Sequence, residues 1–131
     1  MPTVIAYIST LVALAGLDFL WIGVFMKDFY QESLAPYIAK NFNLPAAGLL
    51  YLIYTAGILY FAILPSGTWV SATWRGAFLG FVAYSLYDLT NIVTFSSWPL
   101  ELGIIDIVWG TILTAVAAGI GFAAMQYLVT N

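Results

Sequence analysis

Three aspartates inside long apolar stretches of this 131-residue chain are the residues most able to carry chemistry. Asp18, Asp88 and Asp106 stand there without any lysine or arginine in the same stretches. Asn91 follows Asp88 by three residues, which places the amide and the carboxylate on one helix face. A carboxylate in hydrocarbon is costly unless it is protonated, hydrogen-bonded, hydrated or paired with a cation. We therefore expect one of these forms of compensation at each aspartate.

The amino-acid inventory narrows the possible chemistry. The chain has no histidine and no cysteine, so it lacks an imidazole base, a thiol nucleophile and the usual ligands of zinc. We expect no metal site and no cofactor. Any reaction must use carboxylates, hydroxyls, amides or aromatic rings. Lysine and arginine together number three, which is too few for a nucleic-acid partner.

Composition assigns the chain to the integral membrane proteins. Hydrophobic residues make up 63% of it and charged residues 7%, whereas a soluble domain carries about a quarter charged residues. Four apolar runs reach the length of about 20 residues that a membrane-crossing helix needs. They cover residues 4–26, 46–64, 76–95 and 103–129. We predict an all-α, four-helix transmembrane bundle that forms one membrane domain over residues 1–131.

The connection between the first two runs, residues 27–44, mixes aromatic side chains with charged ones. This pattern is typical of a short helix in the headgroup region, interrupted near Pro36, although an ordinary solvated loop fits it as well. Lys27 and Lys40 lie on one side of the membrane and Arg75 on the other. That difference is too small to orient the protein.

The rise of an α-helix places the polar residues in the same half of the bilayer. At 1.5 Å per residue, Asp18 and Asp88 lie roughly 12 and 10 Å from the membrane side opposite to the N-terminus, and Asp106 about 5 Å from it. Asp18 and Asp88 are the candidate catalytic residues. The candidate ligand-binding residues share this half of the bilayer: Asn91, Asp106, Trp21, Trp109, Tyr51, Tyr54 and Tyr84. Either Tyr51 or Tyr54 of the second run is expected to face Asp18, Asp88 and Asn91 inside the bundle, where its hydroxyl can donate to a carboxylate.

The same aspartates have a structural interpretation. Buried carboxylates serve as interhelical clasps in some membrane bundles. Asp106, near the start of its helix, is also explained by the helix dipole and headgroup water. Asp18 and Asp88, deeper and without basic partners, favour a functional pocket.

Two further patterns concern packing. Asp18-x-x-Trp21 and Asp106-x-x-Trp109 echo each other on the first and last runs, which suggests an inverted repeat. Small residues predict close helix packing at Gly76-x-x-x-Gly80 and at Gly110, Thr114 and Ala118. Three tryptophans are expected to anchor interfacial loops: Trp69, Trp74 and Trp98.

These segments resemble an uncharacterised bacterial family of small four-span membrane proteins, catalogued as a domain of unknown function. The resemblance rests on LDFLWIG at 17–23, YDLTN at 87–91, WPL at 98–100 and DIVWGT at 106–111. It implies four spans and a multi-pass location in a bacterial inner membrane, and it marks Asp18, Asp88, Asn91, Asp106 and Trp109 as motif positions. It implies no reaction. Members of the family often carry lysines around the Trp-Pro-Leu turn, where this chain has Ser96, Ser97 and Glu101.

Three functions fit the sequence. The first is binding of a hydrophobic or lipid-like ligand among membrane lipids, extending to acid-catalysed chemistry on an isoprenoid, sterol-like or fatty-acyl substrate, with Asp88 donating the proton and Asp18 stabilising positive charge. The second is a small proton- or cation-coupled transporter, acting as a homo-oligomer. The third is a structural or accessory subunit whose carboxylates are clasps. A lipid-accessible cavity would favour the first, and a water-filled path the second.

Overall fold

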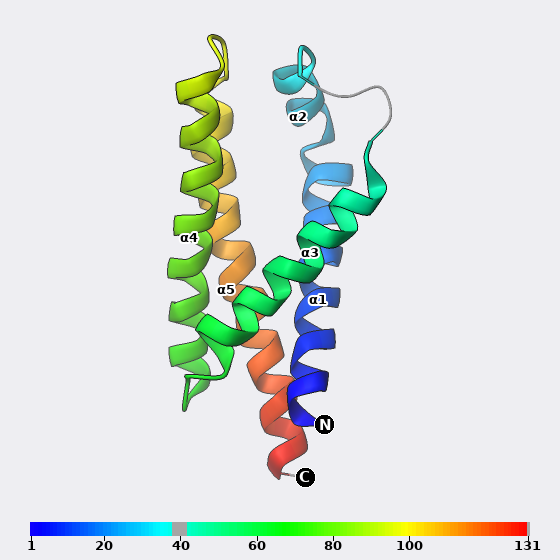
Figure 1. The fold of residues 1–131 in the computed structure, drawn as a ribbon, viewed down its shortest axis with the longest axis vertical. Coiled ribbons are helices and arrows are strands. Elements are labelled where there is room, and N and C mark those ends of the chain that lie inside the picture. The colour runs from blue at the N-terminus through cyan, green and yellow to red at the C-terminus, as the bar shows by residue number, and fades with distance from the viewer. Residues whose placement is uncertain (38–41, 131) are drawn as a thin grey trace.

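The computed structural model describes residues 1–37 and 42–130, and within these ranges the chain is helical without any strand. Each of four long apolar helices can cross a membrane. The four spans are α1 (Pro2–Leu20) continued by the π-helical turn η1 (Trp21–Phe25), α3 (Leu44–Ile58) continued by the π-helical turn η2 (Leu59–Ile63), α4 (Trp69–Thr94), and α5 (Leu100–Thr130). The start of α1 and the end of α5 lie at the same end of the molecule (Figure 1). The predicted all-α membrane bundle is confirmed.

The third span begins earlier than expected, at Trp69 rather than at residue 76. Its N-cap is Thr68, whose hydroxyl accepts a hydrogen bond from the backbone N–H of Ser71 at 3.1 Å. Such a cap stabilises a helix start irrespective of membrane depth, so the charge of Arg75 does not mark the boundary. The prediction that Trp69 and Trp74 lie in a loop is wrong, because both are exposed residues of α4.

The connection after the first span contains the short helix α2 (Lys27–Leu34), so the helical interpretation of this segment is confirmed. It ends before Pro36, in agreement with the restriction that proline places on the preceding residues. Tyr30 is buried, whereas Asp28 and Glu32 are exposed. Lys40, which is expected on the same side of the membrane as Lys27, lies outside the described residues.

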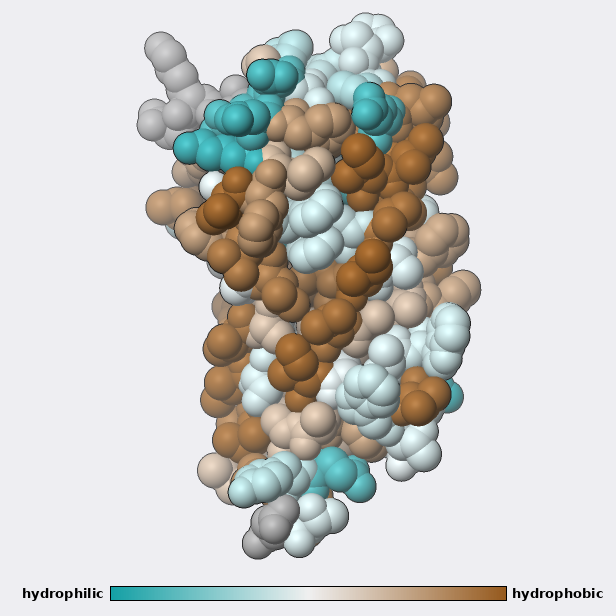
Figure 2. Space-filling model, turned by 180° about the vertical axis from the view of Figure 1, so that it is seen from behind, coloured by the Kyte–Doolittle hydropathy of each residue, from teal (hydrophilic) through white to brown (hydrophobic). Residues whose placement is uncertain are grey.

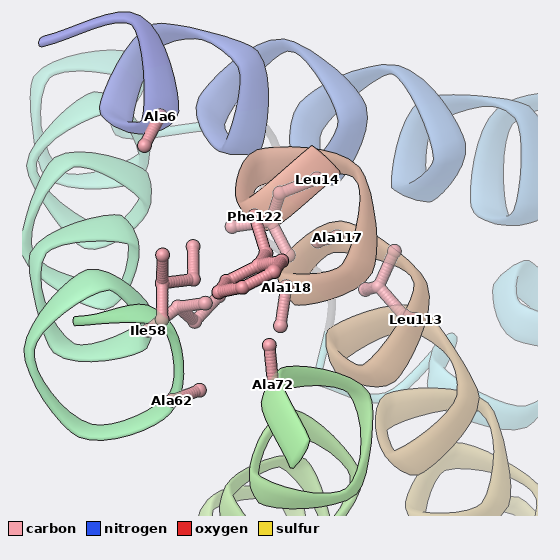
Figure 3. Packing of buried hydrophobic residues seen from close by; sticks show 10 residues of the cluster. Ala6, Leu14, Ile58, Ala62, Ala72, Leu113, Ala117, Ala118 and Phe122 are labelled. Atoms are coloured by element: carbon pink, nitrogen blue, oxygen red, sulfur yellow. The ribbon is translucent and has the colours of Figure 1, made fainter. Parts of the chain in front are cut away.

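The half of the molecule near the chain ends is closely packed. Apolar side chains from α1, α3, η2, α4 and α5 converge there (Figure 3). Glycines allow the helices to approach: a Cβ on Gly76 would collide with Ala118, and one on Gly80 would collide with the backbone of Gly110 and with Thr114. The predicted small-residue packing between the third and fourth spans is therefore present in the structure. Close van der Waals contact of this kind is a main source of helix association in lipid.

The second span crosses the others at a slant (Figure 1). Its last turn, η2, contacts α4 and α5, whereas α3 itself contacts α1. On the face opposite to Figure 1, hydrophilic residues gather at the two ends and mainly hydrophobic residues cover the length between them (Figure 2). This distribution is the one expected of a surface that faces lipid.

Candidate functional site

A cavity lies in the half of the molecule remote from the chain ends, and the slanted helix α3 forms part of its wall. Its volume is about 910 Å³, within the range of small-molecule sites. Its wall comes from the end of α1, from η1 and α2, from the first half of α3, from the second half of α4 and from the start of α5. Six predicted site residues lie in this wall: Asp18, Asp88, Asp106, Tyr51, Tyr54 and Tyr84.

Asp18 joins three helices through its carboxylate. The Tyr51 hydroxyl on α3 donates to Oδ2 at 2.5 Å, and Trp109 Nε1 on α5 donates to Oδ1 at 3.1 Å. The side chain is 8% exposed. Two donors therefore satisfy this buried carboxylate without any basic residue.

Trp21 and Trp109 lie behind the cavity wall as a stacked pair. Their ring centroids are 4.4 Å apart and their planes differ by 6°. Trp21 Nε1 donates to the Tyr30 hydroxyl at 3.1 Å, and that hydroxyl donates to Asp106 Oδ1 at 3.2 Å. The echo in the sequence thus has a geometric counterpart. Trp109 of the second motif donates directly to Asp18 of the first. Trp21 of the first motif is connected to Asp106 of the second through Tyr30.

Tyr30 is a site residue that sequence reasoning missed. It belongs to α2, outside the four spans. Burial raises the pKa of its hydroxyl above the usual range, so the group stays protonated and able to donate to Asp106 at neutral pH. Helix rise gives depths only for residues within the apolar runs, and Tyr30 lies outside them. It therefore could not show that α2 reaches Asp106.

Asp88 differs from the other two aspartates. It is completely buried, and neither of its carboxylate oxygens has a hydrogen-bond partner among the described residues. Trp98 Nε1, in the connection between α4 and α5, is likewise buried and unpartnered. Both residues belong to the cavity wall. Unpaired polar groups are costly in a membrane interior. Asp88 and Trp98 Nε1 therefore need hydrogen-bond partners that the described residues do not supply.

Asn91 and Tyr54 stand apart from the carboxylates. Asn91 is not part of the cavity wall, and its buried Nδ2 has no hydrogen-bond partner among the described residues. The Tyr54 hydroxyl pairs with Thr114 Oγ1 at 2.7 Å and not with a carboxylate. The periodicity of α3 places Tyr54 at the level where α5 presents a threonine, whereas Tyr51 lies one turn closer to Asp18. Of the two tyrosines, Tyr51 makes the expected bond.

The cavity wall also contains residues that the sequence did not assign to the site. These are chiefly Lys27 and Gln31 on α2, Tyr87 on α4 and Trp98 in the following connection. Lys27 is exposed, so a cation stands at the rim of a cavity whose deeper wall holds three acids. Within the described part of the chain, no group of three or more acidic, histidine or cysteine side chains could hold a metal ion.

Comparison with known proteins identifies a family and nothing closer. No curated protein matches the chain, and no solved structure matches it. A family model described as "Predicted membrane protein (DUF2177)" matches residues 3–123. The matched region contains every residue of the cavity wall. The chain is therefore a multi-pass membrane protein that belongs to the DUF2177 family of predicted membrane proteins.

Proposed function

We propose that this protein binds a hydrophobic, lipid-like ligand in the cavity between α1, α3, α4 and α5. The observation that carries the proposal is the cavity itself, which has a size suited to a small molecule and three carboxylates in an otherwise largely apolar and aromatic wall. A few polar groups in an apolar wall are the usual composition of a ligand site, where they fix the orientation of the ligand.

The route into the cavity supports a ligand that arrives from the lipid. Leu50 on α3 and Tyr87 on α4 line the cavity, and both are exposed on the molecular surface. Both also lie within membrane spans. The cavity therefore reaches the surface between α3 and α4 at membrane level, where acyl or isoprenoid chains are present.

The packed half of the molecule argues against transport through a single chain. Between the cavity and the chain ends, side chains such as Leu14, Ile58 and Leu113 are completely or almost completely buried in an apolar cluster. A solute leaving the cavity toward the chain ends would have to cross this cluster. Lateral binding therefore fits the geometry better than a path across the membrane.

Acid-catalysed chemistry on the bound ligand is a second candidate, favoured by the unequal bonding of two aspartates. Asp18 is held by two donors, which suits a carboxylate that stabilises positive charge. Asp88 has no hydrogen-bond partner in the described part of the chain, which leaves its carboxyl group available to exchange a proton with a ligand. The rings of Tyr51, Tyr54 and Tyr84 would assist a cationic intermediate. In this candidate Asp88→Asn abolishes conversion of the ligand and leaves its binding intact, which chromatography of bound lipids measures.

Native mass spectrometry of the purified protein tests the binding function. We expect the wild type, purified in a neutral detergent and incubated with a membrane lipid extract, to retain an amphiphile. Ala83→Phe places a ring in the cavity and should remove the adduct. Ala56→Phe adds the same ring to an exposed position of α3 outside the cavity wall and should retain it. The spectra also report whether the protein forms a homo-oligomer.

Two results would contradict the binding function. One is a wild-type protein that retains no amphiphile after incubation. The other is an Ala83→Phe variant that is folded by circular dichroism and still carries the same adduct as the wild type. In that case the ligand binds elsewhere on the apolar surface.

A further inference from the structure

We propose that the polar end of the cavity recognises the primary ammonium group of an amphiphile, bound by Asp88 with Asp106 beside it. The proposal rests on the ligand-binding function above and specifies the chemical class of the ligand. Its starting point is an unmatched acceptor: both oxygens of Asp88 are buried in the cavity wall, and no described residue donates a hydrogen bond to them.

The bonding of the other carboxylates shows that this is not a general property of the chain. Asp18 accepts two hydrogen bonds and Asp106 accepts one from Tyr30. Asp106 interacts with Asp88 and lines the same cavity, so a second carboxyl group lies at this end of the cavity. A buried carboxylate pair needs a cation, a proton or donors from outside the chain. An ammonium group supplies both charge and donors.

Aromatic rings next to Asp88 fit a cation as well. Tyr87 and Trp98 line the cavity, with ring centroids 6.2 Å apart and planes at 86°. The two rings are in edge-to-face contact, and the face of an aromatic ring attracts positive charge. Trp98 Nε1, which has no acceptor within the described chain, can in addition donate to an oxygen of the same head group.

The choice of a primary ammonium follows from elimination among head groups. A hydroxyl donates a hydrogen bond but carries no charge to offset two carboxylates. A quaternary ammonium carries the charge but has no N–H for the Asp88 oxygens. An anionic head would be repelled by Asp88 and Asp106, and the cation available to it, Lys27, is exposed at the rim. Of these four kinds of head group, the primary ammonium alone carries a positive charge together with N–H donors.

Competition among amphiphiles of equal chain length tests the proposal. Dodecylamine, dodecanol and dodecanoate are titrated near neutral pH against the protein in a neutral detergent, and binding is measured by native mass spectrometry. We expect dodecylamine to bind at least about tenfold more tightly than dodecanol. Asp88→Asn should weaken dodecylamine about tenfold and leave dodecanol nearly unchanged, since the amide keeps the size but not the charge.

Asp28→Asn is the matched control, because it makes the same change of net charge at an exposed position of α2 outside the cavity wall. It should leave all three affinities unchanged. The wild-type comparison does not depend on the folding of any variant. Equal binding of the three amphiphiles, or preference for dodecanoate, would overturn the ammonium assignment while leaving the binding function in place. If none of the three binds, the binding function fails as well.

Discussion

The three intramembrane carboxylates differ in how far the protein itself satisfies them. Asp18 has two donors and Asp106 has Tyr30, so both behave as the interhelical clasps that a purely structural interpretation predicts. Asp88 has none. A clasp needs a partner on another helix, and the structural interpretation therefore explains two of the aspartates and leaves the third. The chemistry of the site is concentrated at Asp88.

The bond between Tyr51 and Asp18 should contribute more to stability than the bond between Tyr54 and Thr114. Both tyrosines line the cavity and lie on α3, so replacing each with Phe removes one hydroxyl in a similar setting. Tyr51→Phe removes a hydrogen bond to a carboxylate, for which about 1.5–3 kcal/mol is typical, whereas Tyr54→Phe removes a neutral pair of about 0.5–1.5 kcal/mol. In membrane proteins both effects are smaller, with an average of about 0.6 kcal/mol.

Thermal unfolding in detergent measures this difference, with far-UV circular dichroism as the readout. The expected order is a larger loss for Tyr51→Phe than for Tyr54→Phe. Equal losses, or a larger loss for Tyr54→Phe, would mean that Asp18 gains nothing special from its hydroxyl donor. The clasp interpretation of Asp18 would then rest on Trp109 alone.

At the level of the elements, the turn that follows Asp18 leads from α1 into α2, which forms part of the cavity wall. Trp21–Phe25 form a π-helical turn in which the Met26 N–H bonds to the Trp21 carbonyl at 2.7 Å. Such turns are rare and occur often at functional sites. The chain then enters α2, and Tyr30 reaches Asp106. The mixture of aromatic and charged residues fitted either a short helix or a solvated loop in this connection. A hydrogen bond across 76 residues of sequence leaves no periodic signal that could reveal it.

Gly110 on α5 sets the position of a cavity residue on α4. A Cβ added there would overlap the ring of Tyr84, so Gly110→Ala forces Tyr84 to move into the cavity or the helices to separate. Overpacking of this kind costs about 1–3 kcal/mol. We expect Gly110→Ala to lower thermal stability in detergent and to reduce amphiphile retention.

Gly16→Ala is the appropriate comparison, because nothing lies within 4 Å of a Cβ added at Gly16. It should leave stability unchanged or slightly raised, in line with the better helix propensity of alanine. If Gly110→Ala matches Gly16→Ala in both stability and retention, the packing between α4 and α5 does not define the cavity wall.

For the molecule as a whole, composition and hydropathy were sufficient to predict four spans, because the length of a membrane helix is fixed by the bilayer. Helix rise also placed the three aspartates and Tyr51 at one level, and all four line one cavity. The spacing of three residues put Asn91 on the helix face of Asp88, but residues at i and i+3 are about 60° apart around a helix, and Asp88 alone of the two lines the cavity. Residues of the connections, such as Lys27 and Trp98, were missed because their positions depend on how the chain folds back onto the spans.

The molecule has two unlike halves, with the packed core near the chain ends and the cavity near α2 and the connection between α4 and α5. This arrangement requires an even number of crossings, so that both chain ends meet on one side. The chain contains no cysteine, and single cysteines can therefore report topology without background. Thr3→Cys and Thr130→Cys lie at the packed end, and Ser96→Cys lies in the connection at the cavity end; all three positions are exposed.

A membrane-impermeant maleimide applied to sealed vesicles should label Thr3→Cys and Thr130→Cys from the same side and Ser96→Cys from the other. The pattern should invert when vesicles of opposite orientation are used, because the reagent reaches one face at a time. The side that labels Ser96→Cys is also the leaflet in which the cavity lies, since Asp88 and Trp98 belong to its wall. Labelling of Ser96→Cys together with Thr130→Cys from one side would show that α5 does not cross the membrane, and a cavity built on α4 and α5 at membrane depth could not then exist.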